Sequence, residues 1–128
     1  MNISVIGLGK LGLPFSFFLA SKKNKVIGHD VNHEIEKTIF KNEKNIEPNL
    51  NKYIKKNIKN FRYEKNIIEV IRKTKITFLV LPTPSLPNGS FSNKYILQSL
   101  KKILQGLKKK KNKKHLIVIT STVSPGSC

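Results

Sequence analysis

The stretch VIGLGKLGLPF, residues 5–15, constrains the fold of this chain more than any other part of the sequence. Apolar residues 3–6 predict a buried strand, and apolar residues between positions 10 and 21 recur at roughly helical spacing. Between the two, Gly7, Gly9 and Gly12 match the pattern G-x-G-x-x-G. In that pattern the first glycine allows a tight turn, the second lets the backbone approach a pyrophosphate, and the third lets helix and strand pack closely. The stretch is therefore interpreted as a phosphate-binding turn.

The apolar N-terminus allows two other interpretations, a secretory signal and a membrane span. No positive charge precedes the apolar run, and Lys10 and three glycines lie inside it, which is atypical of a signal peptide. As a span the run is marginal in length and is interrupted by Lys10 and Pro14. The single cysteine, Cys128, permits no internal disulfide, which fits a reducing compartment. We therefore expect a cytoplasmic protein with no membrane partner.

Strand-like and helix-like segments alternate along the rest of the chain. The segments with strand character are residues 25–30, 61–63, 76–81 and 116–119. The segments with an amphipathic, helix-like pattern are residues 34–40, 50–58, 67–74 and 95–107. Continuous apolar strands that alternate with helices predict a parallel sheet covered on both faces. With right-handed crossovers, this gives an α/β, Rossmann-like doubly wound parallel sheet in one domain, the size that 128 residues allow.

The second predicted strand ends at Asp30, about 20 residues beyond the glycine motif, as the dinucleotide-binding pattern requires. Its carboxylate would accept hydrogen bonds from the adenosine ribose hydroxyls and would repel a 2'-phosphate. The start of the first helix would offer free amides to the phosphates. These features predict NAD, in preference to NADP, as the cofactor. The simpler alternative is a tight glycine turn followed by an aspartate that only starts a loop.

Further motifs give a family resemblance. They are HDVN at 29–32 with NIEPNL at 45–50, LVLPTPSLPNGSFS at 79–92, and VITSTVSPGS at 118–127. Together with NISVIGLGKLGLPFSFFLA at 2–20, they resemble the N-terminal domain of the UDP-glucose/GDP-mannose dehydrogenase family. The resemblance covers essentially the whole chain and rests on four motifs in the right order and spacing.

The resemblance implies a nucleotide-sugar 6-dehydrogenase, an oxidoreductase of polysaccharide biosynthesis. Such enzymes oxidise the C6 alcohol of UDP-glucose or a related UDP- or GDP-hexose to a carboxylate with NAD, and a cysteine holds the intermediate. By the same resemblance, Asp30 holds the ribose, and Thr83 and Thr122 line the cofactor cleft. The cofactor-binding residues implied are Gly7, Gly9, Lys10, Leu11, Gly12, Asp30, Thr83 and Thr122.

The sequence also departs from the family pattern. Ile35 stands where the family often has a lysine against the adenosine, so that contact is missing or Lys37 replaces it. Asn49 and Ser124 replace a glycine and a proline of two motifs. The family continues into a central helix, on which its homo-oligomers depend, and a second nucleotide-sugar domain with the catalytic cysteine. Residues 1–128 are therefore expected to be an incomplete NAD-binding domain without catalytic residues, and Cys128 does not match the family's cysteine.

Charge and histidine content point to no other ligand. The formal charge of +18 would attract nucleic acid, but basic residues lie all along the chain and do not concentrate on one element. The lysine run at 108–114 is interpreted as a solvated helix end and turn. His29, His33 and His115 have no zinc-like spacing, so no metal is expected, although His29 could neighbour the ribose.

Two alternatives remain open besides the nucleic-acid binder. One is a stand-alone NAD-binding module without catalysis. The other is part of a 3-hydroxyacid or 6-phosphogluconate type dehydrogenase, which opens with a similar glycine motif. The pair of motifs around Thr83 and Thr122 favours the nucleotide-sugar family over the latter.

Overall fold

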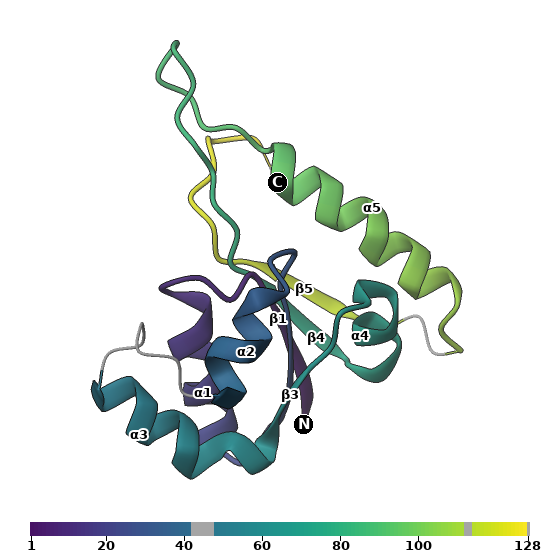
Figure 1. Cartoon of the computed structure of the whole chain (residues 1–128). Helices are drawn as coiled ribbons and strands as arrows, with labels where there is room; N and C mark the ends of the chain where they lie inside the picture. The colour runs from purple at the N-terminus through teal and green to yellow at the C-terminus, as the bar shows by residue number, and fades with distance from the viewer. Residues whose placement is uncertain (42–47, 112–113, 128) are drawn as a thin grey trace.

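Five parallel strands form the central sheet of the computed structural model, which describes residues 1–41, 48–111 and 114–127 (Figure 1). The strands are β1 (Asn2–Ile6), β2 (Lys25–His29), β3 (Phe61–Tyr63), β4 (Ile76–Leu79) and β5 (Leu116–Ile119). Their order across the sheet is β3-β2-β1-β4-β5, and every neighbouring pair is parallel. The predicted doubly wound α/β sheet is confirmed. Because the chain moves one way from β1 and then the other, the order reverses beside β1, and ligands of such sheets bind at that point.

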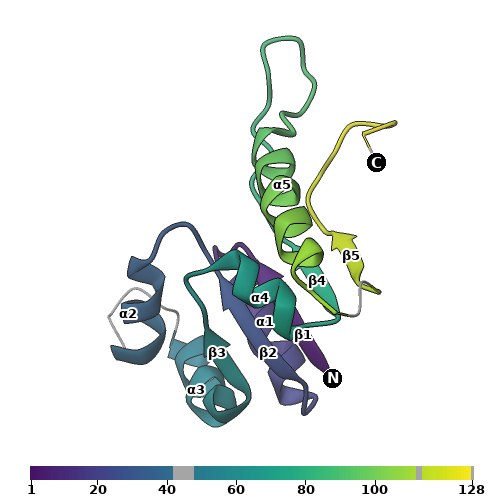
Figure 2. The ribbon, with the colours of Figure 1, turned by 90° about the vertical axis from the view of Figure 1, so that its right-hand side faces the viewer.

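Helices lie on both faces of the sheet (Figures 1 and 2). They are α1 (Gly12–Ser21), α2 (Glu34–Lys41), α3 (Pro48–Asn57), the short 3-10 helix η1 (Ile58–Asn60), α4 (Ile67–Lys73) and α5 (Lys94–Lys108). Figure 2 shows α4 and α5 on one face of the sheet. Several predicted boundaries differ from the observed ones by one or two residues, and two of these differences have a clear cause. The first helix begins at Gly12 and not at Lys10, because the glycine turn continues to Leu11, and β4 ends at Leu79, since the amide of Leu81 already donates to the Ser121 hydroxyl.

Two apolar clusters fill the space between the sheet and the helices. The first joins Phe17 of α1 to Val5 and Val26 of the sheet and to Ile54 of α3. The second joins α4 and α5 to the other face of the sheet, and Ile103 of α5 is fully buried in it. The first cluster packs β1 and β2 against helices, and the second packs β1 and β4 against helices on the other face. The carboxyl ends of these three strands form the site described below.

Polar side chains cross-link the amino-terminal end of the sheet. The Ser4 and Thr77 hydroxyl oxygens are 2.6 Å apart, and Thr77 Oγ1 lies 2.8 Å from Nε2 of His115. Lys110 Nζ donates to His115 Nδ1 at 3.1 Å and also to the carbonyl oxygen of Thr74. Because the ammonium can only donate, Nδ1 accepts and Nε2 carries the proton. Burial lowers the pKa of His115, and the charge of Lys110 lowers it further.

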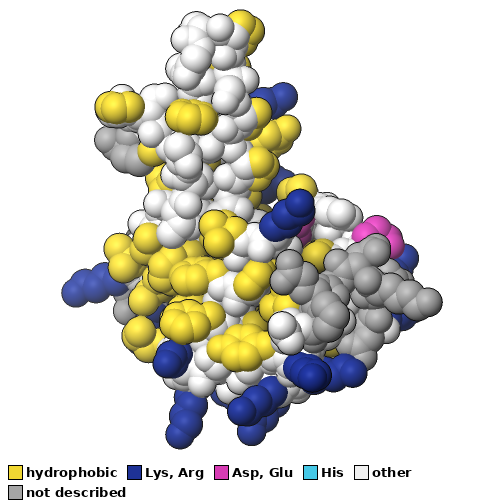
Figure 3. Space-filling model, turned by 90° about the vertical axis from the view of Figure 1, so that its left-hand side faces the viewer, with side chains coloured by type: hydrophobic (Ala, Val, Ile, Leu, Met, Phe, Trp, Pro, Cys, Tyr) yellow, Lys and Arg dark blue, Asp and Glu magenta, His cyan; other side chains and the backbone are white. Residues whose placement is uncertain are grey.

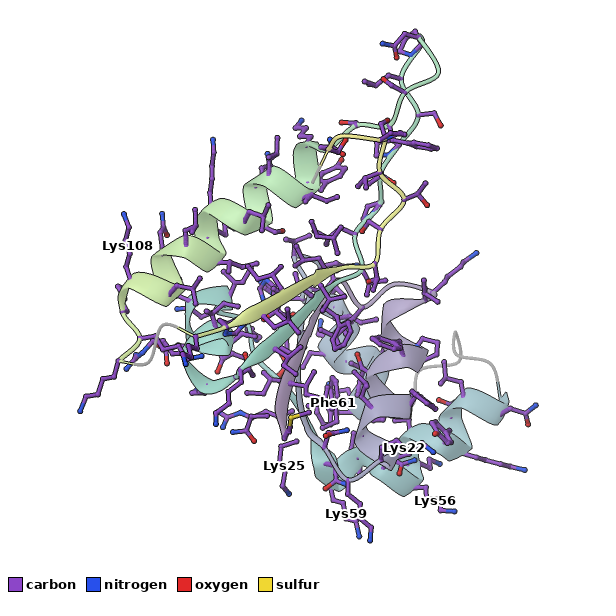
Figure 4. All side chains as sticks on the ribbon, turned by 180° about the vertical axis from the view of Figure 1, so that it is seen from behind. Lys22, Lys25, Lys56, Lys59, Phe61 and Lys108 are labelled. Carbon is purple, nitrogen blue, oxygen red and sulfur yellow. The ribbon has the colours of Figure 1, made fainter. Side chains whose placement is uncertain are left out.

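Positive charge is spread over the molecule, as the sequence predicts. In Figure 4, Lys22, Lys25, Lys56 and Lys59 point outward around one end of the molecule, while Lys108 projects from the end of α5. The lysine run is a helix end and turn where it is described, but Lys110 corrects the expectation of a fully solvated run. Its ammonium is partly enclosed, and burial lowers its pKa.

Some predicted features fall on residues that the structure does not describe. These are most of the loop that precedes Pro48, including part of the NIEPNL motif, two lysine-run positions at 112–113, and Cys128. Within the described ranges, no helix is long and apolar enough to cross a membrane. The same ranges contain no group of three histidine, cysteine or acidic side chains that could hold a metal ion.

Candidate dinucleotide site

The turn between β1 and α1 is shaped by its first and third glycines. Gly7 has φ +94°, a left-handed conformation that favours glycine, and its amide donates to the carbonyl of His29 at 2.9 Å. A Cβ at Gly7 would overlap the carbonyl oxygen of Val80, and a Cβ at Gly12 would overlap the carbonyl oxygen of Gly7. These positions therefore exclude side chains because the backbone of the turn packs directly against β4 and α1.

The second glycine has a different environment. No atom lies within 4 Å of the position that a Cβ at Gly9 would occupy, and Gly9 lines a cleft. The adjacent start of α1 has no side-chain cap at Leu11 and no acidic residue in its first turn. The Leu13 and Phe15 amides already donate to the Gly9 and Leu11 carbonyls at 3.1 Å, and Pro14 has no N–H. The start of α1 therefore offers an anion beside Gly9 mainly the positive end of the helix dipole.

Asp30 is fixed at the end of β2 by the turn itself. Its Oδ2 accepts a hydrogen bond from the Leu8 amide at 2.7 Å, and its Oδ1 accepts one from the Asn32 amide at 2.8 Å. The Tyr63 hydroxyl donates to the Asp30 carbonyl oxygen at 3.1 Å and is in turn bonded to His33. A carboxylate has about four acceptor positions, so both oxygens keep capacity for ribose hydroxyls.

A cleft of about 450 Å³ opens where the strand order reverses. Its residues come from the glycine turn, the end of β2, the start of α4, the end of β4 and α5. They are Ile6, Gly7, Gly9, His29, Asp30, Val31, Ile67, Val80, Leu81, Pro82, Tyr95, Gln98, Ser99 and Lys102. A largely apolar cleft with a few placed polar groups is typical of a small-molecule or cofactor site.

The wall formed by α5 was not predicted. Tyr95, Gln98, Ser99 and Lys102 follow the spacing i, i+3, i+4, i+7, which places them on one stripe of the helix. The apolar stripe of α5 was recognised in the sequence, but its neighbouring polar stripe was not. A β4–α5–β5 crossover puts this helix beside the carboxyl ends of the strands, and that topology was the signal that could have revealed the stripe.

The predicted cofactor residues divide into three groups. Gly7, Gly9 and Asp30 line the cleft together, and Gly12 lies buried beneath the turn. Lys10 and Leu11 are exposed at the start of α1 and do not line the cleft.

Thr83 and Thr122 form the third group. The cleft includes Pro82, the neighbour of Thr83, but neither threonine. Thr83 is partly buried and Thr122 is exposed. The segments that carry them are joined at their base, where the Leu81 amide donates to Ser121 Oγ at 2.9 Å. Their contact with a cofactor stays a prediction.

His29 and the residues of α2 complete the surroundings of Asp30. His29 is buried and lines the cleft, and its Nδ1 lies 2.9 Å from the Glu64 carbonyl, to which it donates. Burial lowers the pKa of His29, which leaves a neutral ring with Nε2 as an acceptor. Ile35, at the position where the family often has a lysine, packs against the core. Lys37, the possible replacement, pairs with Glu34 at 2.8 Å and does not line the cleft.

A doubly wound sheet, a glycine turn at its first helix and a carboxylate at the end of its second strand define a dinucleotide-binding domain. Comparison with known proteins assigns the family. The model of the UDP-glucose/GDP-mannose dehydrogenase family, NAD binding domain, matches residues 1–128, and the chain belongs to this family. The cofactor predicted from the sequence, NAD, is confirmed by this match.

Individual relatives agree with the family. The chain is 30% identical to GDP-mannose 6-dehydrogenase of Pseudomonas syringae pv. tomato over 99% of its length, and 32% identical to UDP-glucose 6-dehydrogenase of Rickettsia conorii over 100%. It superposes on a ternary complex of GDP-mannose dehydrogenase from Pseudomonas aeruginosa with a TM-score of 0.89 and 26% identity, covering 99% of this chain and 30% of that one. The chain spans about 30% of the length of these curated relatives.

Proposed function

We propose that this chain is the NAD-binding part of an NAD-dependent nucleotide-sugar 6-dehydrogenase, which oxidises the C6 alcohol of a nucleotide-activated hexose to a carboxylate. The observation that carries the proposal is the joint position of Gly9, the uncapped start of α1 and Asp30 around one cleft. This arrangement matches the two ends of a dinucleotide, since one end of the cleft suits phosphates and the other suits ribose hydroxyls. Residues 1–128 are proposed to be one domain.

The residues of the chain fit the cofactor physically. The open space beside Gly9 admits a pyrophosphate to the backbone, while the positive end of the α1 dipole stabilises its charge. Asp30 is proposed to accept hydrogen bonds from the adenosine ribose, and its negative charge disfavours a 2'-phosphate. Ile6, Ile67 and Leu81 give the cleft an apolar floor that suits an adenine ring and excludes water from it.

Bound NAD would supply the hydride acceptor of the reaction. The part proposed for this chain is to bind and orient the cofactor at the carboxyl edge of the sheet. We assign no nucleophile or proton acceptor to it, because no described side chain near the cleft combines the required chemistry with the required position. The proposed substrate is a nucleotide sugar, because the relatives are named for GDP-mannose and UDP-glucose.

A second candidate function is a stand-alone NAD-binding module. The observation that favours it is that the described cleft contains cofactor-binding groups without an acid/base pair. The two functions differ in turnover. NADH formation from UDP-glucose or GDP-mannose by the native protein, purified from its own cells, would support the dehydrogenase, and saturable NAD binding without any turnover would support the module.

The cofactor assignment is tested by titrating NAD into the chain and into Asp30→Ala. Loss of a charge-assisted hydrogen bond should weaken NAD binding by about 1–3 kcal/mol. Glu34→Ala is the matched control, because it removes a nearby carboxylate that is exposed and outside the cleft. Circular dichroism checks that the variants are folded, since Asp30 also holds the Leu8 and Asn32 amides. An unchanged NAD affinity in folded Asp30→Ala would refute the role of this residue.

A further inference from the structure

The cleft is lined by one carboxylate and one lysine side chain, which come from different elements. Asp30 lies at the end of β2, and Lys102 lies on α5. His29 also lines the cleft, but its ring stays neutral because burial lowers its pKa. The cleft therefore presents a side chain of each charge type to a ligand.

Lys102 occupies its wall by helix geometry. It follows Tyr95, Gln98 and Ser99 on the stripe of α5 that faces the cleft, seven residues after the first of them. None of the ion pairs within the described residues involves Lys102. Lys102 and His29, the last residue of β2, line the same cleft.

The other cations near Asp30 are turned away or engaged elsewhere. Lys37 forms an ion pair with Glu34 on the exposed side of α2, and Lys65 pairs with Glu36 at 3.0 Å. Neither lysine lines the cleft. Among the described residues that line the cleft, the lysine is Lys102 of α5.

We propose that Lys102 is a cofactor-selectivity residue, whose ammonium faces the adenosine ribose across the cleft and offsets the repulsion between Asp30 and a 2'-phosphate. The inference rests on the proposed cofactor site and extends it to NADP. Asp30 disfavours the 2'-phosphate, and Lys102 reduces that preference. The site therefore discriminates between NAD and NADP less strongly than Asp30 alone would make it.

The charges of the two cofactors set the direction of the effect. NADP carries the additional 2'-phosphate, with a charge of about −1.5 to −2 if it titrates like other phosphate monoesters. A cation close to the ribose therefore stabilises bound NADP more than bound NAD. The interaction is partly screened by water, so its size is that of an exposed or half-exposed charge pair.

The test is a pair of calorimetric titrations, with NAD and with NADP, of the chain and of two variants. Lys102→Met removes the charge while keeping a long, helix-compatible side chain. Lys101→Met is the matched control, because Lys101 is the exposed neighbour on α5 and does not line the cleft. Lys102→Met should weaken NADP binding about 3- to 10-fold, NAD binding by less than about 3-fold, and Lys101→Met should change both by the same small factor.

The possible outcomes separate this inference from the proposed function. The selectivity role of Lys102 is refuted if the ratio of the NAD and NADP dissociation constants is the same in Lys102→Met and Lys101→Met. It is also refuted if the unaltered chain binds NAD but not NADP. Both outcomes leave the proposed NAD binding intact. If the unaltered, folded chain binds neither dinucleotide, the cofactor site and the inference built on it both fail. A selective loss of NADP affinity in a folded Lys102→Met variant supports the proposal.

Discussion

The two halves of the sheet differ in how completely they are covered. In β1, Ile3, Ser4, Val5 and Ile6 are all buried, whereas none of the four residues of β5 is. Ile117 and Ile119 pack towards α5, so Leu116 and Val118 point to the opposite face, where Leu116 is 58% exposed. The part of the sheet around β1, which carries the glycine turn, is buried on both faces, whereas β5 at the outer edge is covered on one face only.

Hydrophobic side chains are also exposed on the side of the molecule that carries α1, where Figure 3 shows them gathered below the protruding loop. Exposed Leu11 and Phe18 of this region add to the apolar area. The comparison teaches that the glycine turn lies in the well-buried part of the sheet, where it packs against Val80 just after β4, while the residues of β5 are only partly buried or exposed.

The largest expected difference between the halves is in core substitutions. Phe17→Ala removes a fully buried ring that packs on Phe61, and it should lower the free energy of unfolding by about 3–5 kcal/mol. Leu116→Ala, the counterpart in β5, should lower it by less than about 1 kcal/mol, since most of the side chain is already in water. Urea unfolding of both variants measures the contrast. Equal losses would show that the two halves are equally well packed.

A smaller effect is expected inside the glycine turn, where packing and cofactor contact separate. Gly12→Ala forces a Cβ against the Gly7 carbonyl and should destabilise the fold by about 1–3 kcal/mol. Gly9→Ala meets no protein atom, so its stability should be nearly unchanged while its NAD affinity falls. Thermal unfolding together with NAD titration checks both. A Gly9→Ala variant that unfolds early would contradict the assignment of this glycine to the ligand and not to the fold.

The smallest effect is a pH dependence that belongs to the outer half. The folded chain holds the pKa of His115 below its ordinary value of 6.5, so below that pH the unfolded chain binds more protons than the folded one. Stability contributed by this group is present above about pH 6.5 and is lost as the pH falls through the ordinary value towards the lowered one. Urea midpoints at several pH values should therefore drop on the acid side.

His115→Gln is the matched variant for that measurement. It should flatten part of the acid drop. His29, whose pKa is also lowered by burial, contributes to the remainder, and Glu34 and Glu64, whose pKa values are lowered as well, contribute at lower pH. The same slope in the variant and in the unaltered chain would show that His115 does not titrate on unfolding as described. Hydrogen exchange of β5 amides at low pH would locate the loosened strand.

The order of the elements could be predicted because each has a strong local pattern. The apolar runs of β1, β4 and β5 and the amphipathic stripe of α5 are recognisable in isolation, and Gly7, Gly9 and Asp30 were found from their spacing. Residues that reach the site through tertiary packing gave no such signal. Gln98, Ser99 and Lys102 have the pattern of the solvated side of a helix, and Tyr95 was assigned to its apolar face, until the crossover places all four beside the cleft.

The same limit explains the errors at element ends and in the lysine run. Residues 80 and 81 continue the apolar run of β4, yet Leu81 binds the Ser121 side chain, a contact that depends on β5 lying alongside. Lys110 resembles its neighbours in sequence, but His115 and the Thr74 carbonyl draw its ammonium inward. The end of β4 and the position of the Lys110 ammonium both depend on contacts with residues far away in the sequence, and not on local propensity.

The two amide bonds to Asp30 have a consequence for the thermodynamics of ligand binding. The side chain of an exposed aspartate samples several rotamers, and a ligand that binds one of them must oppose the loss of that freedom. Here Leu8 and Asn32 already select one orientation of the carboxylate, 22 residues and two residues away in the chain. The ordering entropy is thus incurred when the domain folds and not when a ribose arrives. The carboxylate is thus preorganised for the ribose that we propose as its ligand, so the hydrogen bonds of that ligand would be expressed directly as affinity.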